Sequence, residues 1–337
     1  MTIVLGALML EILLHVRCRS WNPEYISHRT TIEINGIFVL LVFLSHFCQY
    51  LTIPLPYSHI YYEVRRILGQ LVVTTFLFYS GYGVMYCIRH QKERYIDKLP
   101  KKICEMILMF SIAVLIYVII QGALGKSYSV SHILYSCIGW KSVGNSNWYL
   151  FVILLLYGIT YFSFKVFRDD EKYALFCILV LSLFSMIWLK DVQNGTRWYN
   201  TFLCYPAGVT FCIYQKQIEK YVMNSSLRYW CTLLLLCAGF IVCYKLRSNL
   251  LFYELHSILF VLIVTAVSMK IVLHSTILEW VGKRIFGIYI LQRIVMILGE
   301  NFGLQTNPVF YFIFCLIGVM AFAQIFPILT RKARKLL

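Results

Sequence analysis

Long apolar runs alternate with short polar segments along most of the chain. About ten runs are long enough to cross a bilayer, since a spanning helix needs about 20 mostly apolar residues. We place them at about Ile34–Pro54, Arg66–Ile88, Ile103–Ala123, Asn147–Phe167, Tyr173–Leu189, Trp198–Tyr214, Arg228–Tyr244, Leu250–Met269, Ile277–Leu298 and Pro308–Thr330. The pattern predicts an all-α, polytopic membrane helix bundle with about ten transmembrane helices.

The segment before residue 32 differs from the spans. Met1–Val16 is apolar but shorter than a span, and it holds Glu11 and His15 four residues apart, on one face of a helix. It lacks the basic start and small-residue cleavage site of a signal peptide. We therefore expect an N-terminal interfacial or cytoplasmic segment over residues 1–31, followed by one membrane domain over 32–337, with an eleventh span as the alternative for Met1–Val16.

Composition agrees with a membrane protein. The chain is 60% hydrophobic and 14% charged, with a mean hydropathy of +0.72. Soluble domains are about 45–50% apolar and about 25% charged. Ten spans leave no room for a separate soluble catalytic domain, so chemistry must come from residues on helices or in loops of modest length.

The net charge of +16 is best explained by topology. If both ends are cytoplasmic, most of the 31 Lys and Arg fall on the cytoplasmic side, as the positive-inside rule requires. No basic stripe is interleaved with exposed aromatic residues, so we expect no nucleic-acid partner. The 12 Cys are scattered, without C-x-x-C pairs or His-rich neighbours, which predicts neither a metal site nor a disulfide framework.

His46 is the first candidate for chemistry, because an ionisable residue inside a span is costly and usually functional. Counted from Ile34, it lies twelve residues along its helix, roughly 18 Å deep and past mid-membrane. A donor from the cytoplasm and an acceptor from outside can meet there, which suits a general base acting on a hydroxyl. A plain hydrogen bond to a neighbouring helix is the structural alternative.

Three other groups of residues also stand out in the sequence. Arg89–Lys102 carries six Lys or Arg against two acids, which fits either a topology signal or a landing site for the phosphates of a nucleotide-like donor. Ser80–Gly83 fits close helix packing. Residues 145–149 and 197–201 place Trp and Tyr beside Asn and Arg at outer ends of spans, which fits interfacial anchors or a sugar-binding site.

Glu254 and His256 are the other ionisable residues inside a predicted span. Two positions apart on a helix, they point to different faces. We do not expect them to form an acid and base dyad.

Several segments together resemble acyltransferase family 3, the integral-membrane O-acyltransferases. Ile34–His46 resembles the first-helix pattern that ends in the catalytic His of that family, and FLFYSGYGV resembles its second-helix SGY motif. The run from Tyr95 to Ile103 resembles the basic stretch before its third helix. Later signatures are matched by GNSNWYLFVILLLYGITY, RWYNTFLCYPAGVTF and WVGKRIFGIYILQ, which begin at residues 144, 197 and 280.

The resemblance implies transfer of an acyl group, commonly acetyl, from cytoplasmic acyl-CoA to a hydroxyl of an extracytoplasmic or lipid-linked glycan. His46 is then the base or acyl-handling residue. The residues implied at the CoA site are Lys101, Lys102, Ser80 and Tyr82. Those implied at the acceptor site are Asn147, Trp148, Arg197, Trp198 and Asn200. The expected location is a bacterial plasma membrane, in contact with membrane lipids.

Two departures from the family keep alternatives open. Asn35 stands where the family often has Arg, so Arg29 or a loop Lys would have to replace that Arg. Gln292 stands where many members have His. A transporter or flippase of a lipid-linked glycan and an inactive relative are the other interpretations. The acceptor, the acyl chain length and the oligomeric state, including a homo-oligomer, stay open.

Overall fold

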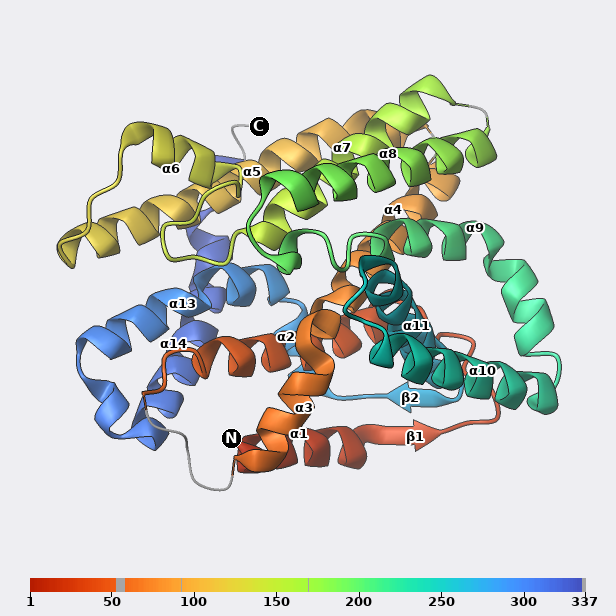
Figure 1. Ribbon diagram of the computed structural model, residues 1–337, viewed down its shortest axis with the longest axis horizontal. Coiled ribbons are helices and arrows are strands. Elements are labelled where there is room, and N and C mark those ends of the chain that lie inside the picture. The colour runs from red at the N-terminus through yellow and green to blue at the C-terminus, as the bar shows by residue number, and fades with distance from the viewer. Residues whose placement is uncertain (53–57, 92, 169, 335–337) are drawn as a thin grey trace.

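The computed structural model describes residues 1–52, 58–91, 93–168 and 170–334, and the fold is almost entirely helical (Figure 1). Its helices are α1 (Thr2–His15), α2 (His28–Phe47), α3 (His59–Leu68), α4 (Thr74–Gln91), α5 (Glu93–Ala123), α6 (Val130–Cys137), α7 (Trp148–Val166), α8 (Glu171–Val192), α9 (Cys204–Val222), α10 (Ser226–Lys245), α11 (Leu250–Ser268), α12 (Thr276–Gly282), α13 (Ile285–Asn301), α14 (Pro308–Leu329) and α15 (Arg331–Arg334). Short 3-10 turns are η1 (Gly69–Val73), η2 (Thr196–Trp198) and η3 (Leu304–Thr306), and the strands are β1 (Val16–Cys18) and β2 (Ile271–Leu273).

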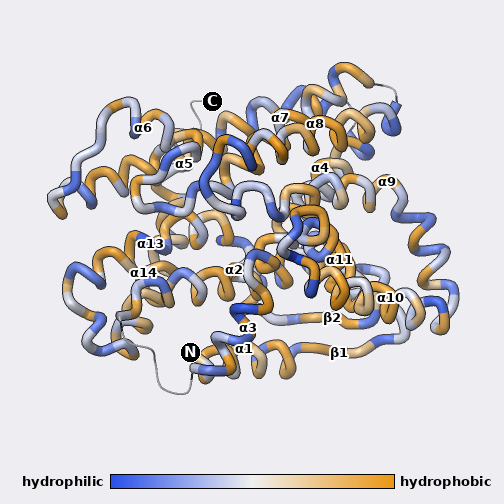
Figure 2. The backbone as a smooth tube through the Cα atoms, in the orientation of Figure 1, coloured by the Kyte–Doolittle hydropathy of each residue, from blue (hydrophilic) through white to orange (hydrophobic). Residues whose placement is uncertain are grey.

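Eight helical segments of the described chain are long and apolar enough to cross a membrane, which confirms the all-α membrane bundle. They are α2, α3 with α4, α5, α7, α8, α10, α11 and α14. Two predicted spans, 198–214 and 277–298, are absent from this set. The first corresponds to α9, whose C-terminal half is hydrophilic in Figure 2. The second is divided into α12 and α13, the longer of which has 17 residues.

The helix that carries His46 does not have the predicted bounds. The hydroxyl of Ser27 accepts a hydrogen bond from the backbone N–H of Thr30, which caps α2 at His28, six residues before the predicted start. The helix ends at Phe47, so the prediction of 34–54 is wrong at both ends. His46 therefore lies 18 residues, about 27 Å, from the first residue of α2 and close to its C-terminal end.

The second predicted span, Arg66–Ile88, is broken. α3 ends at Gly69, which has a φ of 47° that favours glycine, and the chain continues as η1 before α4 begins. Non-helical backbone at membrane depth is tolerated where it lines a cavity. Gly69 and Gln70 do line one, as described below.

The basic segment 89–102 is not the predicted loop. It forms the end of α4 and the beginning of α5, although residue 92 lies outside the described part, and α5 accommodates Pro100. The predicted loop Leu124–Ser146 also contains a helix, α6. In α4 and α5, polar and basic residues form helical turns because Lys, Arg, Glu and Gln have high helix propensity even where no apolar pattern indicates a helix.

The N-terminal segment is fixed to the bundle through β1 and β2, which pair antiparallel with Val16 opposite Leu273 (Figure 1). α1 has 14 residues and a length of about 21 Å, which is shorter than the hydrocarbon core of a bilayer. Glu11 and His15 share a face, as predicted, with 3.2 Å between the carboxylate and Nδ1. The strands were not predicted, because each has only three residues and its partner lies far away in the sequence, so no local pattern indicates them.

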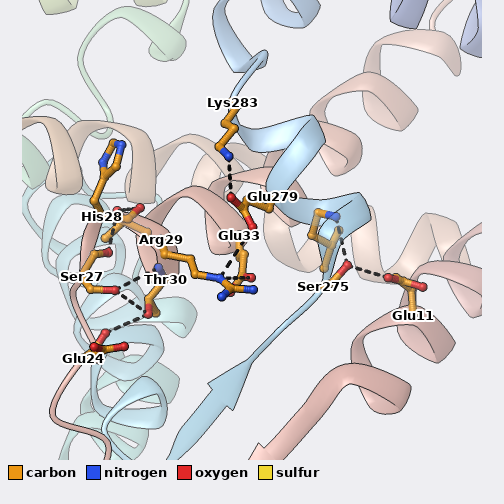
Figure 3. Close-up of polar contacts among 12 residues, drawn as sticks. Glu11, Glu24, Ser27, His28, Arg29, Thr30, Glu33, Ser275, Glu279 and Lys283 are labelled. Carbon is orange, nitrogen blue, oxygen red and sulfur yellow. Dashed lines mark hydrogen bonds and ion pairs between the residues drawn. The ribbon is translucent and has the colours of Figure 1, made fainter.

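A polar network joins the N-terminal end of α2 to α12 (Figure 3). The Arg29 guanidinium lies between two carboxylates, 3.2 Å from Glu33 and 3.6 Å from Glu279. Ser275 donates a hydrogen bond of 2.6 Å to Glu11. Arg29 is thus already paired and lines none of the cavities described below, which argues against its taking the place of the Arg missing at position 35. The network holds the start of the helix that carries His46.

Glycines allow two pairs of helices to approach closely. A Cβ on Gly36 of α2 would overlap the backbone carbonyl of Leu278 in α12. A Cβ on Gly81 of α4 would overlap the carbonyl of Tyr205, and one on Gly208 of α9 that of Phe78. Small residues at helix crossings let backbones pack in contact in this way. The backbones of α2 and α12, and of α4 and α9, are therefore in direct contact.

Candidate active site

A polar cavity of about 350 Å³ lies beside the C-terminal end of α2. This volume is within the range of about 300–1,000 Å³ typical of small-molecule sites. Its wall includes Ser45, His46 and Gln49 from α2 and the turn after it, Gly69, Gln70, Val72 and Val73 from η1, residues 142 and 144–148 before and at the start of α7, Arg197 from η2, and Tyr289 and Arg293 from α13. Segments far apart in the sequence therefore meet around His46.

His46 is held by helices on several sides. Its Nδ1 is enclosed and has no hydrogen-bond partner among the described residues. The Gln292 amide lies close enough to interact with the imidazole, and its nitrogen also donates to the carbonyl oxygen of Tyr289 at 3.0 Å. The Gln292 oxygen is buried and unpartnered in the described part of the chain. The residue at the departure from the family pattern is thus a direct neighbour of His46.

Arg293 is fixed against the polar cavity by three uncharged groups. Its guanidinium donates to Gln49 at 2.8 Å, to Ser146 at 3.0 Å and to Tyr50 at 3.4 Å. Arg65 donates in the same way to the Ser45 hydroxyl, at 3.1 Å. These contacts tie α13, α3 and the loop before α7 to the end of α2.

A second cavity, of about 220 Å³, lies on the other side of Tyr289 and is mostly apolar. It is lined by Asn35, Phe76, Ser80, Met106, Tyr149, Leu150, Ile153, Tyr157, Ile285, Phe286, Tyr289 and Ile290. Asn35, at the other departure from the family, faces this cavity, and its buried Oδ1 has no partner among the described residues. The SGY segment contributes Ser80 to the same wall.

Tyr289 forms part of the walls of both cavities. Its ring centroid is 6.4 Å from that of His46 and 5.5 Å from that of Tyr149. The consecutive residues Trp148 and Tyr149 line the polar and the apolar cavity, respectively. A thin aromatic layer, Tyr289 with Tyr149, therefore separates His46 from the apolar cavity.

The residues predicted at the acceptor site are divided by the structure. Asn147, Trp148 and Arg197 line the cavity of His46. Trp198 is instead buried against Trp140, with ring centroids 6.0 Å apart. Asn200 is buried outside the cavity wall, and its backbone carbonyl accepts a hydrogen bond from Ser257. The last two residues support the fold near the cavity and do not contact its space.

The residues predicted at the CoA site are also divided. Ser80 lines the apolar cavity, but the Tyr82 hydroxyl donates to Gln215 at 2.8 Å and lines neither cavity. Lys101 and Lys102 are exposed, with the Lys102 amine 4.2 Å from the ring centroid of Tyr95. Lys102 is four residues before Met106 of the apolar cavity, and so lies on the same face of α5, one turn away.

Glu254 and His256 are both buried in α11, and within the described chain no hydrogen bond or ion pair joins them. The Glu254 carboxylate accepts the backbone N–H groups of Phe202 and Leu203, at 2.9 and 3.1 Å, at the start of α9. The His256 ring stacks on Phe240, with centroids 4.4 Å apart. This geometry agrees with the prediction that the two residues form no dyad.

Tyr289 and Arg293 are the site residues that sequence reasoning missed. Arg293 did leave a signal, since it is a cation within the apolar run of α13 and such residues usually face a cavity. Tyr289 left none, because a Tyr in a membrane helix is ordinary. Among the described residues, no three His, Cys, Asp or Glu side chains gather as they would around a metal ion.

The comparison with known families decides the class of protein. Residues 34–326 match the family Acyl_transf_3, described as an acyltransferase domain. The chain belongs to this acyltransferase family. The match starts one residue before Asn35 and includes both cavities and every predicted site residue. No curated protein and no solved structure matches this acyltransferase at a significant level.

Proposed function

We propose that this membrane acyltransferase moves an acyl group, commonly acetyl, from cytoplasmic acyl-CoA to a hydroxyl of an extracytoplasmic or lipid-linked glycan in a bacterial plasma membrane. His46 acts as the general base. The observation that supports this most strongly is that two cavities of opposite polarity share Tyr289, with His46 in the polar one. Family membership favours an enzyme over a flippase.

The apolar cavity suits the acyl end of the donor. Its wall is aromatic and aliphatic, with Ser80 and Asn35 as polar groups. The exposed amines of Lys101 and Lys102 lie about one turn of α5 beyond Met106, where a phosphate group outside the cavity can be bound as a point charge. On this arrangement the nucleotide part of CoA stays at the membrane surface and only the thioester end enters the bundle.

The polar cavity suits the acceptor. Asn147 and Arg197 supply hydrogen-bond donors for sugar hydroxyls, and Trp148 supplies an aromatic surface for the apolar face of a sugar ring. His46 belongs to the same wall, so a hydroxyl held there lies within reach of the imidazole. These groups are the kind of lining expected for a polar ligand.

The chemical step needs only the imidazole and the two substrates. The imidazole removes the proton of the acceptor hydroxyl as its oxygen attacks the thioester carbonyl, which gives a tetrahedral intermediate. This intermediate collapses, the carbon–sulfur bond breaks, and the CoA thiolate takes the proton from the imidazolium. An ester and free CoA result, and His46 returns to its neutral form.

The two departures from the family are compatible with this step. Asn35 carries no charge, so its contribution to donor binding is limited to hydrogen bonds in the apolar cavity. Gln292 lies beside the imidazole and can orient it. Mass spectrometry of the surface glycan from cells with and without this protein tests the proposal. We expect an acetyl-sized mass difference that His46→Ala removes; identical glycans in cells that express the normal protein would contradict it.

A further inference from the structure

The polar cavity carries uncompensated positive charge. Arg197 and Arg293 line it, and its wall, as far as the described residues form it, contains no Asp or Glu. Arg65 stands directly behind Ser45. All three guanidinium groups lie close enough to act electrostatically on His46. Within the described part of the chain, no carboxylate forms an ion pair with any of them.

This differs from Arg29 and Arg89, two arginines elsewhere in the same bundle. Arg29 is paired with Glu33 and Glu279, and Arg89 with Glu171 at 2.7 Å. A partly buried cation such as Arg293 is costly in a membrane protein unless an anion or many hydrogen bonds compensate it. Arg293 has only neutral partners. Arg197 is exposed and has no hydrogen bond or ion pair among the described residues.

The geometry points to an acceptor that itself carries an anionic oxygen group, a carboxylate or a phosphate, bound by Arg197 and Arg293. This inference rests on the proposed function and adds the chemical class of the acceptor. The planar guanidinium binds both groups through two parallel hydrogen bonds. Because Gln49, Tyr50 and Ser146 already fix Arg293, little side-chain freedom is lost on binding.

An anion in this position also orients the acceptor for the reaction. Arg197 and Arg293 share the cavity wall with His46 and with Asn147. An acidic group held by the arginines leaves the remaining hydroxyls of the same sugar facing the imidazole. The same positive charge stabilises the negative charge that develops on oxygen as the hydroxyl proton is removed.

Binding can be measured without acyl-CoA, in nanodiscs of phosphatidylcholine, by calorimetry with three probes: methyl glucuronide, glucose 1-phosphate and methyl glucoside. We expect at least one anionic probe to bind about tenfold to a hundredfold more tightly than the neutral glucoside, the range of a charge-assisted hydrogen bond. Tighter binding of the glucuronide would identify the anionic group of the acceptor as a carboxylate. Tighter binding of glucose 1-phosphate would identify it as a phosphate. Equal binding of all three probes, or binding of none, would overturn the inference.

Two variants separate a defined site from general electrostatic attraction. Arg197→Gln should weaken binding of the preferred probe about tenfold, because it removes one guanidinium from the cavity wall. Arg197 is exposed and makes no hydrogen bond within the described chain, so the fold should be unaffected. Lys141→Gln removes an exposed cation close in sequence to the cavity wall but not part of it, and should leave binding unchanged. If both variants lost the same affinity for the probe, general electrostatic attraction and not a defined anion site would explain the binding.

The same measurements keep this inference apart from the proposed function. His46→Ala should still bind the anionic probe while losing acyl transfer. Anion binding without any transfer by the unaltered protein would count against the proposed reaction alone. Transfer to neutral acceptors as fast as to acidic ones would count against the anionic acceptor alone.

Discussion

The ring centroids of His46 and Tyr289 lie 6.4 Å apart, and of the residues that the structure describes, Tyr289 alone lines both the polar and the apolar cavity. Its hydroxyl is buried and has no hydrogen-bond partner among the described residues. On the proposed mechanism, donor and acceptor meet where this ring stands. Tyr289 must therefore move, or the substrates must pass beside it, in each reaction cycle.

Replacing the Tyr289 ring should remove the barrier between the polar and the apolar cavity. Tyr289→Ala joins the cavities, so water from the polar side reaches the thioester, and we expect severalfold faster acyl-CoA hydrolysis without acceptor. Tyr289→Phe keeps the barrier and removes an unpartnered hydroxyl, so it should leave stability unchanged or raise it by about 1 kcal/mol. Release of free CoA measures hydrolysis; equal rates in the two variants would exclude a barrier at this residue.

The α4–α9 crossing should tolerate no side chain at Gly81. Gly81→Ala pushes a methyl group into the carbonyl of Tyr205, and overpacking of this kind costs about 1–3 kcal/mol. Gly83 is two residues away on the same helix and has open space around it, so Gly83→Ala should cost nothing. Unfolding midpoints in detergent compare the pair. A larger loss in Gly83→Ala would mean that the crossing is placed wrongly.

Glu254 should act as a structural support for the segment that follows Arg197. Its carboxylate accepts the backbone N–H groups of Phe202 and Leu203, and Glu254→Ala leaves both without that partner. We expect a loss of about 1–3 kcal/mol in the free energy of unfolding. Glu300→Ala, at an exposed position, is the control and should change it by less than about 0.5 kcal/mol. If Glu254→Ala and Glu300→Ala were equally stable, Glu254 would not support this segment.

Lys101 and Lys102 should bind the phosphates of the donor. Lys101→Ala with Lys102→Ala should weaken acyl-CoA binding, and the difference from the unaltered protein should shrink as salt screens the charges. The control pair Lys216→Ala with Lys220→Ala removes two exposed cations from α9. If the affinity for acyl-CoA fell equally in both double variants, or in neither, Lys101 and Lys102 would serve only to orient the protein in the membrane.

The sequence predicts several helices well because polar or charged residues bound their apolar runs. α7 spans 148–166 against a predicted 147–167, and α11 spans 250–268 against 250–269. It fails at α2, whose polar first turn carries no apolar signal and is fixed by the Ser27 cap. It also fails at Gly69, since a break in a span depends on the cavity that the broken backbone lines.

The residues of the candidate site were also predicted only where the local sequence carries a signal. His46 stands out in the sequence because an ionisable residue inside a span is rare. Asn147, Trp148 and Arg197 stand out because Asn or Arg accompanies aromatic residues at the ends of spans. The structure brings all four to one cavity. Trp198, close to Arg197, has the same local signal but turns into an aromatic cluster. Packing between distant segments decides which side of a helix faces a cavity, and the local sequence pattern carries no information about that packing.

The central claim is that His46 removes the proton of the acceptor hydroxyl, and one pair of variants tests it most directly. His46→Gln and His256→Gln each replace an imidazole in a membrane helix, but His256 lines neither cavity. In reconstituted protein, with acyl-CoA and acceptor glycan, we predict that His46→Gln lowers the transfer rate about 10²–10⁴-fold while His256→Gln keeps it. Transfer by His46→Gln at the rate of the unaltered protein would contradict the account.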